Sequence, residues 1–201
     1  MSEKFTCGGF VTSKIFRLIG QDPATMSPAA RGLLAQLRGA LGKEPATVPA
    51  IWGVTLDGIP DDLSAKRRSH TEMAIHLALT QFAMHQQGRS RSMHSKQPFG
   101  VAVRRLADSS SGSQDVHETP VYKRFTALAQ ATTLAGLEAH SRGIISQLRS
   151  HEIPFDYGRY ADDLYWFLTG HQRDVQRRWG RDFHRLTLSP TTDNTPEGDL
   201  A

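Results

Sequence analysis

The stretch Met73–Met84, with the sequence MAIHLALTQFAM, decides the fold. Nine of its twelve residues are apolar, so a helix over this stretch has no polar face. A helix that is hydrophobic on every side belongs in the centre of a bundle, where other helices cover it. The apolar run is interrupted by His76, Thr80 and Gln81, and it is too short to span a membrane. The stretch therefore predicts a buried central helix that continues to about Gln87.

The segments on both sides of this helix also follow a helical period. Ser27 before Pro28 is typical of a helix start, because Ser caps free N–H groups and Pro has no N–H to leave unpaired. Further starts are expected near residues 4, 61–62, 98–99, 120, 132–133 and 156, with a break at Gly170. Because alternation typical of strands is nearly absent, the sequence predicts an all-α bundle of seven or eight helices.

Residues 1–186 are expected to form one all-helical domain, and a polar linker near 109–119 leaves open a division into two sub-bundles. Residues 187–201 are rich in Pro, Thr, Asp and Gly and are expected to form a polar, flexible tail. The apolar stripes of the helices predict a core that contains Ile75, Leu79, Phe82, Phe125, Leu148, Leu164, Trp179 and Phe183.

Positive charge favours an anionic partner. The chain carries a net charge of +4, and residues 63–149 contain 12 basic and 5 acidic residues. Arg outnumbers Lys by 18 to 6, and the planar Arg fork makes paired hydrogen bonds with phosphate. The N-terminus has no long apolar segment and Cys7 is the single cysteine. We therefore expect a cytoplasmic protein without a secretory signal, a disulfide or a membrane span.

Motifs for catalysis and metal binding are missing. The chain has nine histidines, but the closest pair, His70 and His76, is six residues apart. Two ligands on one helix face need a spacing of three or four residues. The side chains of the adjacent Asp162 and Asp163 diverge on a helix, so one of them is expected to be solvated. We therefore expect no catalytic residue, no metal and no cofactor.

The last expected helix carries a ladder of cations, which consists of Arg173, Arg177, Arg181 and Arg185. Residues four apart share one side of a helix, so the ladder can follow several phosphates of a strand. A solvated face with local ion pairs explains the same spacing. Asp174 and Asp182 lie four residues on either side of Arg178, so we expect Arg178 to be neutralised. Arg177 and Arg181 are then the better candidates for phosphate contacts.

Further basic residues lie on other expected helices. They are the pairs Arg104 with Arg105 and Lys123 with Arg124, and the residues that share a helix side, Arg31 with Arg38 and Arg142 with Arg149. Their distribution over several helices, with few paired acids, favours an extended basic groove. Such grooves hold single strands without reading their sequence.

Seven segments follow one another in order over residues 30–185. They are ARGLLAQLRGALG at Ala30, PAIW at Pro49, IHLALTQFAMHQQ at Ile75, FGVAVRRL at Phe99, YKRFTALAQA at Tyr122, LEAHSRGIISQLR at Leu137, and FDYGRYADDLYWF at Phe155 leading into RRWGRDF. Their order and spacing resemble the CasB-type small subunit of the type I-E CRISPR surveillance complex, Cascade. The WGRDF and AMHQQ segments weigh most in this resemblance.

The resemblance implies an all-helical, non-enzymatic subunit whose partners are other Cascade protein subunits, a second copy of itself, crRNA and target DNA. It implies a basic surface that helps to hold DNA during R-loop formation. Its segments carry nucleic-acid contacts onto Arg38, Lys123, Arg124, Arg142 and the arginines before and within WGRDF. The predicted nucleic-acid-binding residues are therefore Arg38, Arg104, Arg105, Lys123, Arg124, Arg142, Arg173, Arg177 and Arg181.

Two other functions stay open at this point. A helical DNA-binding regulator would use a compact helix-turn-helix with a basic recognition helix, which the sequence does not show. A metal-dependent hydrolase would need ligand spacings that the histidines lack.

We expect that the purified protein cleaves neither DNA nor RNA when a divalent metal is added, because no arrangement of ligands or nucleophiles is present. Cleavage assays on labelled DNA and RNA check this expectation. Metal-dependent cleavage that a single His→Ala substitution abolishes would contradict it.

Overall fold

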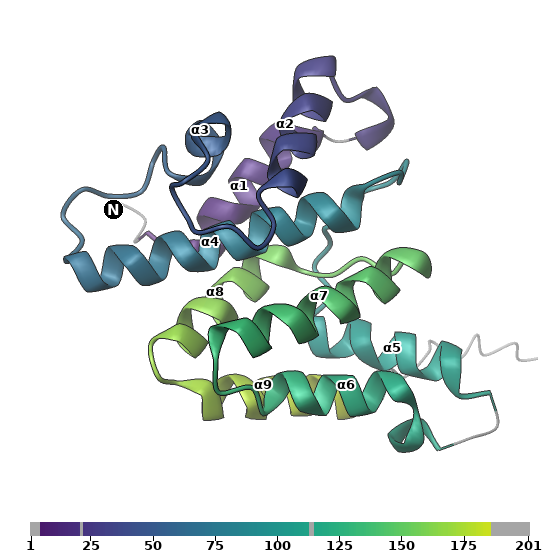
Figure 1. Ribbon diagram of the computed structural model, residues 1–201. Helices are drawn as coiled ribbons and strands as arrows, with labels where there is room; N and C mark the ends of the chain where they lie inside the picture. Colours follow the sequence, from purple (N-terminus) through teal and green to yellow (C-terminus); the bar gives the residue numbers. More distant parts are fainter. Residues whose placement is uncertain (1–4, 21, 113–114, 186–201) are drawn as a thin grey trace, which may run out of the picture.

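The computed structural model describes residues 5–20, 22–112 and 115–185 (Figure 1). Within these ranges the chain forms nine α-helices and no β-strand. The helices are α1 (Cys7–Ile19), α2 (Pro28–Gly39), α3 (Trp52–Thr55), α4 (Ala65–Gln86), α5 (Phe99–Ser111), α6 (Pro120–Ala129), α7 (Leu134–Ser150), α8 (Tyr157–Leu168) and α9 (Gln172–His184). Short 3-10 turns lie at Pro23–Thr25, Pro49–Ile51 and Val116–Glu118.

The prediction of an all-α bundle is confirmed. The helix beyond the expected eight is α3, a single turn between Trp52 and Thr55. The predicted break at Gly170 separates α8 from α9, and Gly170 takes a φ of 93°, which favours glycine. The tail predicted at 187–201 lies outside the described residues. None of the helices described is both long and apolar enough to cross a membrane.

Side-chain caps fix where most helices begin. The Ser27 hydroxyl accepts a hydrogen bond from the Ala30 N–H, and the Asp156 carboxylate accepts one from the Arg159 N–H, so both predicted starts are confirmed. The start of α4 was predicted too early. Its N-cap is Ser64, because the preceding turn is held instead by the Arg68 side chain, which donates to the Pro60 carbonyl.

The central helix of the bundle is α4, as the sequence predicts. Every residue from Ala74 to Ala83 is buried, and α1, α2, α7 and α8 pack around the helix (Figure 1). The predicted core is confirmed throughout, because all eight side chains are at most 4% exposed: Ile75, Leu79, Phe82, Phe125, Leu148, Leu164, Trp179 and Phe183.

Burial of α4 forces its polar side chains to find partners inside the protein. The Gln81 amide donates to the Ser141 hydroxyl of α7 at 2.8 Å and accepts from the Tyr160 hydroxyl of α8 at 2.9 Å. His85 Nδ1 lies 3.0 Å from the Tyr157 hydroxyl, and burial lowers the pKa of His85 to about 3, which keeps the ring neutral. His76 bonds the Ala40 carbonyl. These bonds tie α4 to three neighbouring helical segments.

A glycine lets α5 approach α9 closely. A Cβ atom on Gly100 would lie 2.5 Å from the Trp179 carbonyl oxygen and 2.9 Å from the Asp182 Cβ, which is closer than carbon can approach either atom. The two helices therefore pack almost backbone to backbone, and this contact fixes α9 on the bundle.

Replacement of Gly100 by Ala is expected to destabilise the protein by about 1–3 kcal/mol, because the added methyl group overpacks the contact between α5 and α9. Gly32 is the control, since a Cβ there meets nothing within 4 Å. Gly32→Ala should instead stabilise the helix by up to about 1 kcal/mol. Urea unfolding of both variants measures the difference. Equal effects of the two substitutions would contradict the close approach.

Candidate nucleic-acid interface

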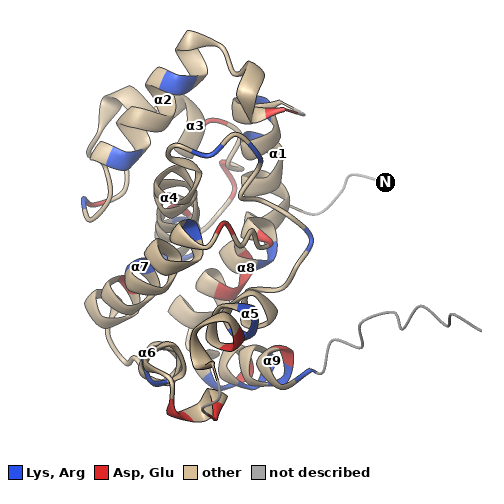
Figure 2. Cartoon of the chain, turned by 90° about the vertical axis from the view of Figure 1, so that its right-hand side faces the viewer, with Lys and Arg blue, Asp and Glu red and all other residues tan. Residues whose placement is uncertain are grey.

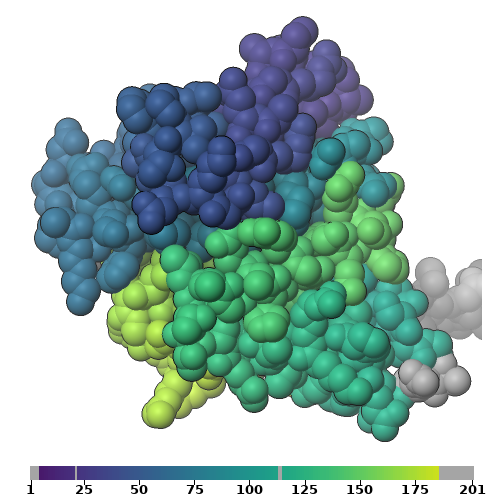
Figure 3. All heavy atoms as spheres, viewed as in Figure 1, coloured from purple at the N-terminus to yellow at the C-terminus, as the bar shows by residue number. Residues whose placement is uncertain are grey.

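Three helices that carry predicted basic residues lie along one side of the bundle, where α7 packs against α6 and both α2 and α7 pack against α4. Figure 2 shows α2, α7 and α6 one below the other along one side of the bundle. In Figure 3 the blue segment that contains α2 sits directly on the green segment that contains α7. Two close contacts continue this arrangement, one between the turn after α2 and α7, and one between α6 and α7. We call this surface the α2–α7–α6 face and define it by Arg31, Arg38, Arg149, Arg142, Arg124 and Lys123.

A basic cavity opens at the upper end of this face. Its volume is about 350 Å³, and its lining includes Arg31 and Arg38 from α2 and the loop that follows α4, from Gln87 to Ser90. Arg149 reaches this loop from α7, because its Nε donates to the Gln87 carbonyl at 3.0 Å. Residues of α2 and of the loop after α4 therefore line the hollow, and Arg149 of α7 lies beside it.

Arg31 and Arg38, which line this cavity, and Arg149 beside it are not balanced by acids of the described chain. Burial, and after it the nearby Arg149 guanidinium, lower the pKa of Arg38. Among the described residues, Arg31, Arg38 and Arg149 form no ion pair. Arg89 is different, since it shares Glu152 with Arg91. Two like charges held together in a half-buried site favour an anion between them.

The lower half of the face is built on α7 and α6. Arg142 pairs with Glu138 one turn earlier at 2.6 Å, and its guanidinium lies over Gly42 in the turn after α2. The side chain of Arg124 rests on Gly143, with its Cδ 3.2 Å from the place of a Cβ there. Lys123 and Arg124 are both exposed. The four predicted residues Arg38, Lys123, Arg124 and Arg142 thus share this face.

The α9 arginines lie elsewhere. In Figure 2, α9 is at the side of the bundle opposite α2 and α7. Arg173, Arg177 and Arg181 are exposed, but Arg177 pairs with Asp174 at 3.1 Å. This pair is more exposed and longer than the pair of Arg178 with Asp163, and Arg181 forms no ion pair within the described residues. The predicted ladder on α9 therefore lies apart from the cavity lined by Arg31 and Arg38, while α9 itself packs against α6.

The carboxylate partner of Arg178 was also misassigned. Arg178 pairs at 2.6 Å with Asp163 of α8, while Asp182 is taken by Arg159 at 2.8 Å. One carboxylate of the Asp162–Asp163 pair was expected from the sequence to be solvated, but neither extends freely into solvent. Asp163 is 3% exposed and also accepts from the Trp179 indole at 2.7 Å, whereas Asp162 accepts from the Gly8 N–H.

The remaining predicted cations lie on α5. Arg104 pairs with Asp108 at 2.8 Å and covers the Phe183 ring, and Arg105 donates to the Gln97 side chain. Arg31 and Arg149 were recognised as sharing helix sides with predicted residues, but neither was predicted to bind. Their proximity depends on the packing of α2 against α4 and of α4 against α7. The spacing of residues within one helix does not predict this packing.

In the described part of the chain, reactive chemistry could reside in a cluster of metal ligands or in the single cysteine. No group of three or more His, Cys, Asp or Glu side chains there is placed to hold a metal ion. Burial, and after it Asp162, raise the pKa of Cys7 to about 12, so this thiol stays protonated and unreactive.

Comparison with known proteins identifies the family. Residues 33–184 match the family model described as CRISPR-associated protein Cse2. CasB from Thermobifida fusca has a similar crystal structure, with a TM-score of 0.76 and 34% sequence identity over 90% of this chain and 100% of that one. The chain belongs to the Cse2 family.

More distant members share the fold. A Cse2-family CRISPR-associated protein from Thermus thermophilus is 22% identical, with a TM-score of 0.65 over 89% of this chain and 98% of that one. CasB from M. ruber is 18% identical, with a TM-score of 0.61 over 88% and 93% of the two chains. No curated protein matches the sequence. This Cse2-family chain is thus a CRISPR-associated protein with the all-helical CasB fold.

The buried Asp163 predicts a pH-dependent stability. Burial raises the pKa of Asp163 from 3.8 to about 6 against the opposing effects of Arg178 and Trp179. Because the folded-state pKa lies above the unfolded value, the folded protein binds the proton more tightly. The stabilisation is therefore fully present below about pH 4 and is lost as the pH rises through about 6.

Relative to Asp163→Asn, the wild-type free energy of unfolding should fall by up to about 3 kcal/mol between pH 4 and pH 7. Urea unfolding of both proteins across this range isolates Asp163, because all other groups titrate in both. A difference that stays constant with pH would mean that Arg178 keeps this carboxylate ionised throughout.

Proposed function

We propose that this Cse2-family chain is a non-catalytic subunit of a type I-E Cascade complex in antiviral defence. Its partners are the other Cascade protein subunits, a second copy of itself, crRNA and target DNA, in the cytoplasm. Its α2–α7–α6 face binds nucleic-acid backbone and stabilises the crRNA-guided R-loop. Family membership supports the CRISPR role, and Arg31 and Arg38 in the cavity beside α2, with Arg149 near them, support the backbone contact.

The observation that carries the proposal is the convergence of Arg31, Arg38 and Arg149. A solvated basic face would spread its cations apart or pair them with acids, as Arg177 is paired on α9. Here burial and mutual repulsion lower the pKa of Arg38, and no acid of the described chain compensates. A phosphate group relieves this repulsion and accepts paired hydrogen bonds from the guanidinium forks.

Backbone contacts of this kind suit R-loop formation. The exchange of a DNA duplex for an RNA–DNA duplex is nearly balanced, so a few protein–backbone contacts decide its direction. Phosphates carry no sequence information, and a subunit of this kind must serve every guide sequence. Arg124 and Lys123 extend the row of cations along α6, beyond the cavity. Arg104, Arg105, Arg173, Arg177 and Arg181 stay candidate contacts outside this face.

The test replaces Arg31, Arg38, Lys123 and Arg124 by Gln in the assembled complex. Each phosphate contact to a single strand contributes about 0.7 to the slope of log affinity against log salt, so the slope should fall by up to about 2.8. The loss should be similar for different target sequences. Target binding at several salt concentrations measures the slope, and size exclusion confirms assembly.

The matched control replaces Arg17, Lys66, Arg67 and Lys96, which are exposed and lie outside the three helices. This control removes the same charge and should leave the slope nearly unchanged. If both quadruple variants reduce the slope equally, the α2–α7–α6 face has no special role. If the first variant fails to assemble, its residues belong to a protein–protein interface instead.

A further inference from the structure

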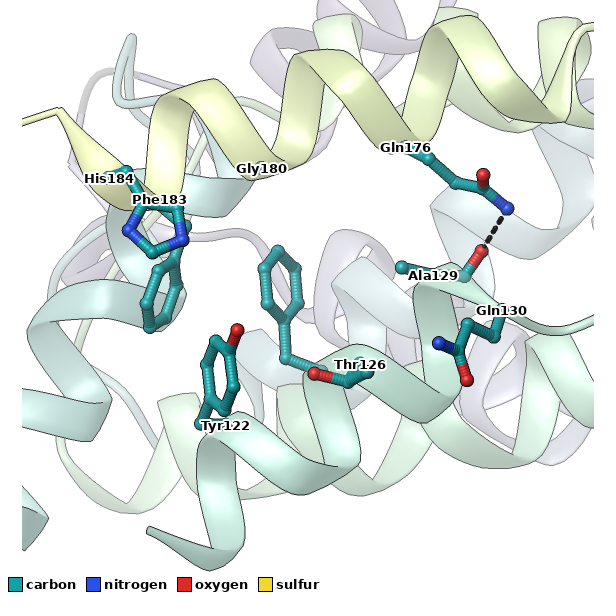
Figure 4. Close-up of a pocket in the computed structure, with 9 residues that line it drawn as sticks. Tyr122, Thr126, Ala129, Gln130, Gln176, Gly180, Phe183 and His184 are labelled. Carbon is teal, nitrogen blue, oxygen red and sulfur yellow. Dashed lines mark hydrogen bonds between the residues drawn. The ribbon is translucent and has the colours of Figure 1, made fainter. Parts of the chain in front are cut away.

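A second hollow lies between α6 and α9, away from the α2–α7–α6 cavity (Figure 4). Its volume is about 260 Å³, and its walls include the rings of Tyr122, Phe125, Phe183 and His184. The Phe183 ring centre lies 5.3 Å from those of both Tyr122 and Phe125. Phe125 and Phe183 are at most 4% exposed, so the ring surface that a ligand can reach in this hollow, which we call the slot, belongs to Tyr122 and His184.

The walls of the slot are held in place by neighbouring side chains. The His184 ring stacks on His117 at 5.4 Å, with an angle of 17° between the rings. At the other end, the Gln176 amide donates to the Ala129 carbonyl and joins α9 to α6. The slot is therefore formed before any ligand enters, which lowers the entropy cost of binding.

Polar groups are available beside the rings. Thr126 and Gln130 line the slot from α6, and Figure 4 shows the Tyr122 hydroxyl pointing into the space between the helices. Within the described residues, the Tyr122 hydroxyl and the Gln130 amide make no hydrogen bond to another side chain or to the backbone. An aromatic slot with free donors and acceptors at its edge suits a planar, polar ring.

Two cations each lie about one helical turn from a residue that lines the slot. Lys123 lies three residues before Thr126, so it shares that side of α6, and Arg173 lies three residues before Gln176 on α9. Both cations are exposed. These two positive charges, one on each helix, favour a ring that is attached to phosphates, although the Asp115 carboxylate lies against His117 behind His184.

We propose that this slot holds one unstacked nucleobase of a single strand whose phosphates lie against Lys123 and Arg173. The proposal rests on the proposed function and goes further, because backbone contacts alone do not engage a base. The volume is below the range of about 300–1,000 Å³ of drug-sized sites, so it suits one ring system rather than a whole dinucleotide. Stacking on aromatic rings tolerates every base, as a subunit that serves many targets requires.

Gly180 offers a way to fill the slot without touching a charge. It lines the slot from α9, and a Cβ atom on it meets nothing within 4 Å. Gly180→Leu places an apolar side chain where the base would lie, and it also removes a glycine from a helix interior, which favours folding. Gly53→Leu on α3 is the control, because it has the same open surroundings outside the slot.

The experiment measures binding of the full chain to single-stranded DNA and to an abasic strand of the same length. Wild type should bind the DNA with bases more tightly, by about 5- to 150-fold for one stacked base. Gly180→Leu should lose this preference and keep its affinity for the abasic strand, whereas Gly53→Leu should behave as wild type. Fluorescence of 2-aminopurine in the strand should be quenched by wild type and not by Gly180→Leu.

The possible outcomes separate the two proposals. If wild type binds both strands equally, the base slot is overturned while backbone binding stands. If neither strand binds, backbone binding by the free chain fails as well. If the melting temperature of Gly180→Leu is lower than that of wild type, Tyr122→Leu serves as the second variant. It removes one stacking surface and must also reduce the preference for bases, or the proposal is wrong.

Discussion

Complete burial of α4 is the constraint on which the rest of the structure depends. A helix without a solvent face needs neighbours on every side, and its polar side chains need partners among them. Gln81 meets this need by bonding Ser141 on α7 and Tyr160 on α8 at once. These bonds specify which helices flank α4 and in what register. As a result, the end of α4 emerges between α2 and α7, where Arg38 and Arg149 meet.

The sequence predicted well whatever depends on a single helix. The burial of Phe82 or Trp179 follows from apolar periodicity, and the start of α2 follows from the cap at Ser27. These features are local, because a helix presents the same face and the same free N–H groups wherever it packs. The start of α4 was less accessible, because the Arg68 side chain that holds the preceding turn also needs Pro60 in its native position.

The ion-pair partners of Arg159 and Arg178 could not be predicted from the sequence, because these pairs form between different helices. Spacing along α9 suggested Asp174 and Asp182 as partners of Arg178, yet the partner is Asp163 on the preceding helix. Asp182 is instead bound by Arg159, which also belongs to α8. The close approach at Gly100 sets the position of α9. The spacing of residues along the sequence does not predict this distance between two helices. Of the α2–α7–α6 face, the resemblance supplied Arg38, Lys123, Arg124 and Arg142, whereas the convergence with Arg31 and Arg149 required the folded protein.

The closeness of Arg38 and Arg149 has a thermodynamic consequence. In the free protein the Arg149 guanidinium disfavours the positive charge of Arg38. A nearby acid would offset this effect. Any anion that settles between the two guanidinium groups stabilises the fold by the same coupling free energy by which the fold strengthens its binding. An anion bound at this place would therefore raise the free energy of unfolding of the chain, and its own affinity would rise with the share of folded protein.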